Sequence, residues 1–112
     1  MASTTISGNS MTVSEATAAL TAGLQSIYGS CLDRVILYGS TDSDVDIAVL
    51  LRPGTTSQMY DRLLDLVVDL ELACSRVLSV VRIDAGKFAA WENVSPFFRN
   101  INREGVVLWK AV

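Results

Sequence analysis

Two short apolar runs separated by a few polar residues constrain the fold of this chain most. The first run covers residues 34–38 (RVILY) and the second covers residues 44–51 (DVDIAVLL). Both are rich in β-branched side chains, which is typical of buried strands. Gly39-Ser40 follows the first run directly, and this pair predicts that the first strand breaks there.

Helical patterns flank the two predicted strands. Thr12 and Glu15 form a capping box at the start of a helix that Gly29 ends, and residues 58–74 carry the strongest apolar periodicity. The remaining predicted elements are a strand at 77–83, a helix capped by Asp84 that runs through Trp91, a helix from Ser95-Pro96 to Gly105, and a strand at 106–109. The resulting order, α-β-β-α-β-α-α-β, predicts an α/β (α+β) fold in which helices pack on a small mixed sheet.

Length and composition limit the class of protein. The 112 residues fit one domain at 11–112, preceded by a polar, flexible tail at residues 1–10. The net charge of −3 argues against a free-standing nucleic-acid binder, and no direct nucleic-acid binding is expected. The chain has no histidine, which excludes His-based triads and disfavours zinc sites. Cys31 and Cys74 are expected to be buried, reduced thiols.

Targeting signals are not expected. The first ten residues are polar and lack the apolar segment of a signal peptide, and no apolar run approaches the ~20 residues of a membrane span. The sequence therefore predicts a cytoplasmic location without membrane contact.

Residues able to perform chemistry gather around the first two strands. Glycine at position 39 lets a ligand approach the backbone, Ser40 adds a hydroxyl donor, and backbone amides in such a turn suit phosphate oxygens. Asp44 and Asp46 lie two positions apart, so their carboxylates would stand on one face of the strand about 7 Å apart. Two like charges at this spacing favour a hard divalent cation such as Mg²⁺. The alternative is a solvated hairpin whose acidic strand simply faces water.

A resemblance supports the first interpretation. The segments Val35-Ile36-Leu37-Tyr38-Gly39-Ser40 and Ser43-Asp44-Val45-Asp46-Ile47-Ala48-Val49-Leu50 resemble the signature of the DNA polymerase beta-like nucleotidyltransferase superfamily, in its minimal bacterial and archaeal branch (MNT). In that family an apolar strand ends in Gly-Ser and the next strand carries Asp-hydrophobic-Asp. The resemblance covers roughly residues 20–112, and the segments at 95–100 and 103–108 are similar to the endings of such minimal domains.

The resemblance implies a function for these positions. Gly39 and Ser40 would hold a nucleoside triphosphate such as ATP, and Asp44 and Asp46 would bind Mg²⁺ and serve catalysis. The implied reaction is transfer of a nucleoside monophosphate to an acceptor hydroxyl. Minimal members often pair with an all-helical HEPN-type protein, in some cases as antitoxin to toxin, so a catalytically weak, antitoxin-like partner is the alternative function. Formation of a homo-oligomer is left open.

The chain departs from the family pattern in two ways. Only three residues separate Ser40 from Asp44, where the family usually has a longer connection over the phosphates, so we expect a tight, hairpin-like link with less cover. Active members also commonly carry a third carboxylate on the next core strand, where this chain aligns Ser79 or Val81. Asp84 follows with the wrong strand parity and is better explained as a helix cap.

Overall fold

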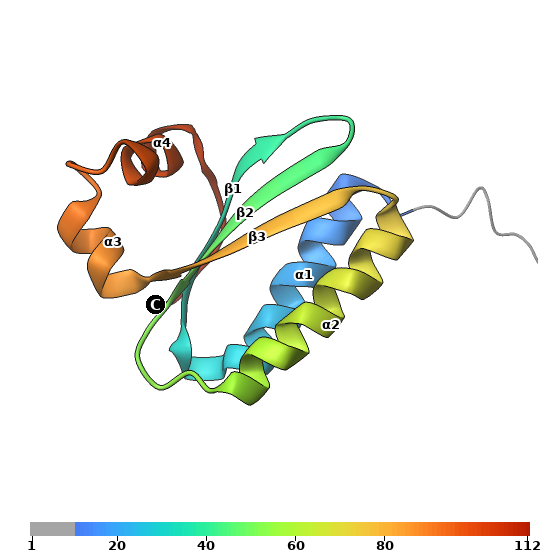
Figure 1. Ribbon diagram of the computed structural model, residues 1–112, viewed down its shortest axis with the longest axis horizontal. Helices are drawn as coiled ribbons and strands as arrows, with labels where there is room; N and C mark the ends of the chain where they lie inside the picture. Colours follow the sequence, from blue (N-terminus) through green and yellow to red (C-terminus); the bar gives the residue numbers. More distant parts are fainter. Residues whose placement is uncertain (1–10) are drawn as a thin grey trace, which may run out of the picture.

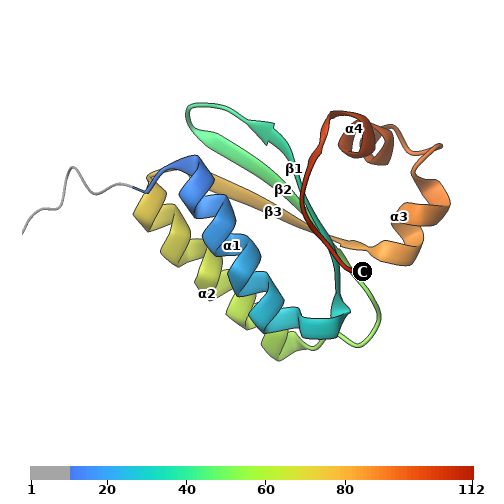
Figure 2. The same cartoon turned by 180° about the vertical axis from the view of Figure 1, so that it is seen from behind.

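The computed structural model describes residues 11–112, so the tail predicted at residues 1–10 lies outside the described residues. Its centre is a four-stranded sheet in the order β3-β2-β1-β4. Two long helices, α1 and α2, cover one face of this sheet, and the short helices α3 and α4 lie on the other side (Figure 1). Figure 2 shows the same two layers from behind.

The elements follow the predicted order. They are α1 (Val13–Tyr28), the 3-10 turn η2 (Gly29–Cys31), β1 (Leu32–Ser40), β2 (Asp44–Leu51), α2 (Ser57–Cys74), β3 (Val77–Asp84), α3 (Ala85–Trp91), α4 (Pro96–Glu104) and β4 (Val106–Lys110). The predicted mixed α+β fold is therefore confirmed. No helix formed by residues 11–112 is both long and apolar enough to cross a membrane.

Side-chain caps begin the helices where the sequence predicts them. The backbone N–H of Glu15 donates to Oγ1 of Thr12 at 3.1 Å, and the N–H of Thr12 donates to Oε1 of Glu15 at 2.9 Å. At α3 the N–H of Lys87 donates to Oδ1 of Asp84 at 2.8 Å. Each cap satisfies a backbone donor that has no partner within its own helix. The role of Asp84 as a helix cap is confirmed.

Strand β2 is the shared element of the fold. It pairs antiparallel with β1 and parallel with β3, and α2 is the crossover of the parallel pair. Val45, Ile47 and Val49 pack toward α1 and α2, whereas Ala48 and Leu50 pack toward α3 and α4. The predicted alternation of this strand is confirmed, and its apolar side chains are buried on both faces of the sheet.

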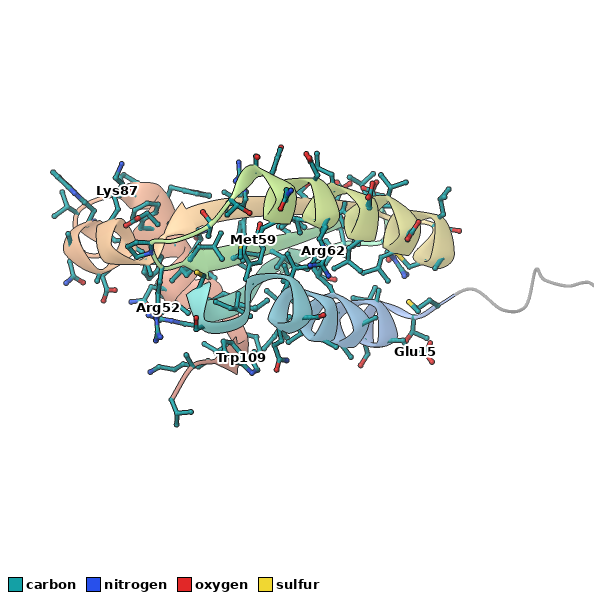
Figure 3. All side chains as sticks on the ribbon, turned by 90° about the horizontal axis from the view of Figure 1, so that it is seen from below. Glu15, Arg52, Met59, Arg62, Lys87 and Trp109 are labelled. Carbon is teal, nitrogen blue, oxygen red and sulfur yellow. The ribbon has the colours of Figure 1, made fainter. Side chains whose placement is uncertain are left out.

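The two faces of the sheet carry two separate apolar cores. The core under α1 and α2 is the larger, and the helices lie side by side along it (Figure 3). The smaller core gathers around Phe88 of α3 and Ile101 of α4, both fully buried. Both cysteines are free thiols, as predicted, but only Cys74 is buried and Cys31 is partly exposed.

Candidate functional site

The Gly39-Ser40 pair is a strand end and not a break. The sequence predicted that β1 stops at Tyr38, but the strand continues through Ser40, and Gly39 and Ser40 pair with Asp46 and Val45 of β2. The prediction was wrong because the three-residue link to β2 brings the two strands together at once. Gly39 and Ser40 therefore form the last pairs of the β1–β2 strands, and not the turn of amides that was predicted to suit phosphate oxygens. The register of the two strands shifts between Leu37 and Gly39.

Gly39 lies directly against the carboxylate of Asp46. A Cβ atom at position 39 would stand 2.6 Å from Oδ2 of Asp46 and 3.3 Å from its Cβ. The first of these distances is shorter than the contacts that real Cβ atoms make. The φ angle of Gly39 is not positive, so it is the space taken by this carboxylate that favours glycine here. The sequence named both residues as site residues, and the structure brings them together.

The two predicted carboxylates stand at the open end of β2. Asp44, the first residue of the strand, is exposed, and Asp46 is partly exposed. Residues i and i+2 of a strand share a face, so both point to the side of the sheet that carries α3 and α4. Ser40, also exposed, ends the neighbouring strand. The four predicted residues therefore lie within one short stretch of the β1–β2 hairpin.

The link between the strands is tight. The N–H of Thr41 donates to the carbonyl of Asp44 at 2.8 Å, and Oγ1 of Thr41 accepts from the N–H of Asp44 at 3.0 Å. Nε of Arg76 donates to the carbonyl of Asp42 at 3.1 Å, which ties the link to the start of β3. The expected hairpin-like connection is confirmed, and it leaves no loop that could fold over the carboxylates.

Ser79 occupies the strand position next to Asp46. The parallel ladder pairs Asp46 of β2 with Ser79 of β3 and Ala48 with Val81, so Ser79 is the residue of β3 beside the predicted site. Asp84 lies at the far end of β3 with the opposite parity, and its carboxylate caps α3. Within the described residues, the hydroxyl of Ser79 therefore lies where active members of the resembled family commonly have a third carboxylate.

Tyr38 is a neighbour of the site that sequence reasoning missed. Partial burial, and secondly the negative charge of Asp46, raise the pKa of its phenol above the ordinary 10.0. Its ring stands edge-on to Phe97 of α4, with centroids 5.9 Å apart and an interplanar angle of 84°. Strand alternation places Tyr38 on the same face as Ile36, but the contact with α4 joins segments far apart in the sequence and has no local signal.

The carboxylates of Asp44 and Asp46 match in number and chemistry those that Mg²⁺ commonly takes from a protein. Within residues 11–112, no group of three or more His, Cys, Asp or Glu side chains is placed to hold a metal ion by itself. Magnesium commonly binds proteins through one or two carboxylates and takes its remaining oxygens from phosphates and water. Asp44 and Asp46 supply such a pair, so these two residues would hold the ion.

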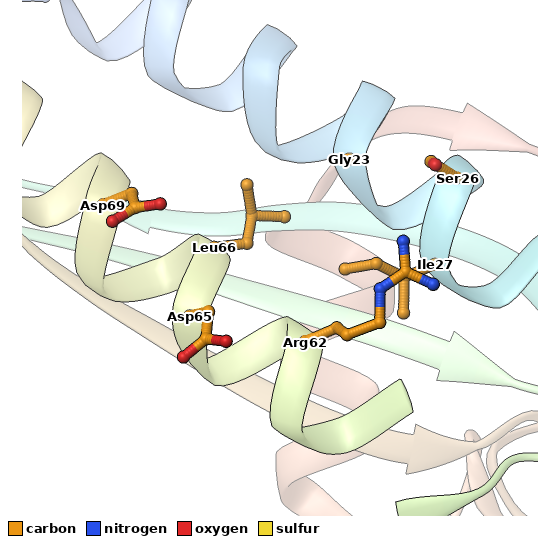
Figure 4. Close-up of a pocket in the computed structure, with 7 residues that line it drawn as sticks. All are labelled: Gly23, Ser26, Ile27, Arg62, Asp65, Leu66 and Asp69. Carbon is orange, nitrogen blue, oxygen red and sulfur yellow. The ribbon is translucent and has the colours of Figure 1, made fainter. Parts of the chain in front are cut away.

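Four hollows of the described residues lie away from the predicted site. One of about 330 Å³ runs between α1 and α2, where Arg62 of α2 reaches toward Ser26 of α1 (Figure 4). Others of about 450, 440 and 250 Å³ lie between α1 and β4, between α2 and β3, and beside the β2–α2 connection. None of the four is lined by Gly39, Ser40, Asp44 or Asp46.

Comparison with known proteins supports the fold. No protein-family model matches the chain, and no curated protein matches its sequence. A solved crystal structure from Shewanella oneidensis matches with a TM-score of 0.52 and 22% sequence identity, over 82% of this chain and 68% of that chain. The similarity shows that the two proteins share an arrangement of helices and strands.

Proposed function

We propose that this chain is a minimal nucleotidyltransferase domain that binds a nucleoside triphosphate with Mg²⁺ and transfers a nucleoside monophosphate to an acceptor hydroxyl. The observation that carries the proposal is the position of the Asp46 carboxylate against the bare backbone of Gly39. Strand stability does not require this arrangement, because aspartate is disfavoured in strands and a Cβ at position 39 would displace the carboxylate. The resemblance of both strands to the family signature supports the same function.

Each residue would have a defined task in this reaction. Asp44 and Asp46 would hold Mg²⁺, which neutralises phosphate charge when bound. Ser40 would donate its hydroxyl to a phosphate oxygen, and Gly39 would let the phosphates approach the strand. The acceptor oxygen would then form a bond to the α-phosphorus while the bond between that phosphorus and the pyrophosphate oxygen breaks. The acceptor proton would leave to solvent, since Ser79 provides no carboxylate base.

Calorimetric titration with ATP and Mg²⁺ tests the binding step. Wild-type protein should bind, and a variant carrying both Asp44→Asn and Asp46→Asn should lose binding at least tenfold, because the cation loses both charged ligands. Asp42→Asn is the matched control, since it removes an exposed carboxylate from the same hairpin and should leave affinity unchanged. Equal binding by the double variant and the wild type would refute the proposal.

A second function is favoured by one observation, the hydroxyl of Ser79 beside Asp46. A member without the third carboxylate can keep its metal and nucleotide while the chemical step is slow, because no group takes the acceptor proton. Such a chain would act as a binding partner of a HEPN-type protein, in the manner of an antitoxin, and would not modify it.

Label transfer from α-phosphate-labelled ATP separates the two functions. The chain is co-expressed with a HEPN-type protein, and transfer is measured for the wild type, Asp46→Asn and Ser79→Asp. Transfer by the wild type that Asp46→Asn abolishes would establish the enzyme and exclude the non-catalytic binding partner. A stable complex without transfer by the wild type, together with transfer gained in Ser79→Asp, would establish the non-catalytic binding partner.

A further inference from the structure

Strand β3 has an open edge. It pairs with β2 over its full length, and among residues 11–112 no other strand lies on its outer side. The outward N–H of Leu78 donates to Oε2 of Glu71 at 2.8 Å, so this group is already satisfied within the chain. Because backbone groups alternate along a strand, those of Val80 and Arg82 also face outward. Unpaired edges of this kind readily add another strand.

An exposed apolar stripe on α2 borders this edge. Leu64, Val68 and Leu72 follow one another at intervals of four residues, and their exposed fractions are 45%, 53% and 78%. A hollow of about 440 Å³ separates the start of this stripe from β3, and Leu64 and Val80 both line it. We call the stripe and the outer side of β3 the edge surface.

We propose that the edge surface binds a second copy of this chain, with the two β3 strands antiparallel across a twofold axis. This pairing would join the two sheets into one continuous sheet with both α2 helices on the same face. The outward N–H and carbonyl of Val80 would pair with those of Val80 in the second copy, and the N–H of Arg82 would donate to the carbonyl of Leu78 there. Leu64 and Val68 would meet the same residues of the other copy, because strands about 4.8 Å apart leave room for helices 8–10 Å apart.

The charges at the ends of β3 favour a second copy as the occupant. Arg76 precedes the strand, Asp84 ends it, and the five residues from Val77 to Val81 carry no charge. Antiparallel self-pairing therefore brings Arg76 of each copy toward Asp84 of the other. Arg82 is held within its own chain, where its guanidinium lies 3.8 Å from the ring centroid of Tyr60.

Helix α2 carries four acidic residues, Asp61, Asp65, Asp69 and Glu71. Asp65 and Asp69 line the groove toward α1 (Figure 4). Asp61 and Glu71 flank the stripe, three positions before Leu64 and three positions after Val68, and the carboxylate of Glu71 is held by the N–H of Leu78. The edge surface is thus apolar along its middle, with Arg76 before one end of β3 and Asp84 at the other. Such a surface is complementary to its own copy under twofold symmetry.

Sedimentation velocity of the full chain, from about 1 to 500 µM, tests the proposal by mass action. The wild type should pass from monomer to dimer, and Val68→Lys should raise the dissociation constant about a hundredfold, roughly tenfold for each symmetric copy. Val107→Lys is the matched control, because Val107 is 52% exposed and lies on β4 at the opposite edge of the sheet. It should leave the dissociation constant unchanged.

Hydrogen exchange gives a second reading that does not depend on a variant. The amides of Val80 and Arg82 should exchange more slowly at the higher concentration, whereas the amides of β4 should not change. A wild type that remains monomeric throughout the range would overturn the proposal. A dimer that resists Val68→Lys, or that only Val107→Lys disrupts, would overturn it as well.

Discussion

Replacement of Gly39 by alanine is the sharpest single test of the predicted site. The added Cβ would stand 2.6 Å from Oδ2 of Asp46, whereas ordinary contacts begin near 3.4 Å. The carboxylate must therefore retreat by about 0.8 Å, the difference between these two distances. Misplacement of a ligand by about 1 Å can cost as much as a factor of a hundred, so we expect ATP and Mg²⁺ to bind 10–100-fold more weakly.

The fold should survive this replacement. Alanine is better tolerated in a strand than glycine by about 0.5–1 kcal/mol, which partly offsets the crowding at Asp46. We therefore expect thermal unfolding to shift by only a few degrees while calorimetry records the loss of affinity. Gly86→Ala is the control, because its Cβ would meet Oδ1 of Asp84 at 3.3 Å and lies away from the hairpin. Wild-type affinity in a folded Gly39→Ala protein would refute the assignment of Asp46 as a metal ligand.

Three further predictions concern stability and ionisation. Gly105→Ala places a Cβ against the carbonyl of Ile101 and Cγ2 of Ile36. We therefore expect the free energy of unfolding to fall by about 1–3 kcal/mol and the melting temperature in calorimetry to fall by about 4–13 °C. An unchanged melting temperature would contradict this packing. Asp46→Asn should lower the pKa of Tyr38, measured by phenolate absorbance against Tyr38→Phe, because the charge of Asp46 helps to raise it. Folding raises this pKa, so the contribution of Tyr38 to stability is complete below pH 10.0 and is lost as the pH rises through the folded pKa. Tyr38→Phe should therefore weaken the loss of stability at alkaline pH. An unchanged dependence of stability on alkaline pH would contradict this linkage.

Much of the fold follows from local signals. The Thr12 and Glu15 capping box and the Asp84 cap begin their helices as predicted, because caps are fixed by residues three positions apart. The alternation of β2 placed Asp46 and Ala48 on one face, since strand periodicity needs no knowledge of the partner strands.

Other features depend on contacts between distant segments. The continuation of β1 through Ser40 follows from the short link to β2, and the pairing of Asp46 with Ser79 became definite only with the register of the parallel strands. Tyr38 meets Phe97 across 59 positions of sequence, the difference between the two residue numbers, and no local pattern reports such a contact. The sequence also did not predict which apolar side chains of α2 are exposed, because Leu64 and Val68 satisfy helical periodicity yet face outward past the edge of the sheet.

The central position of β2 has a consequence for how the molecule opens. Its side chains complete the packing of both helical layers, so removal of either layer uncovers the same strand. Neither half of the molecule can therefore unfold while the other retains its full stability, and the amides of Ala48 and Leu50 should open only with the whole fold. The carboxylates at the start of this strand are thereby attached to the strand that both helical layers hold in place.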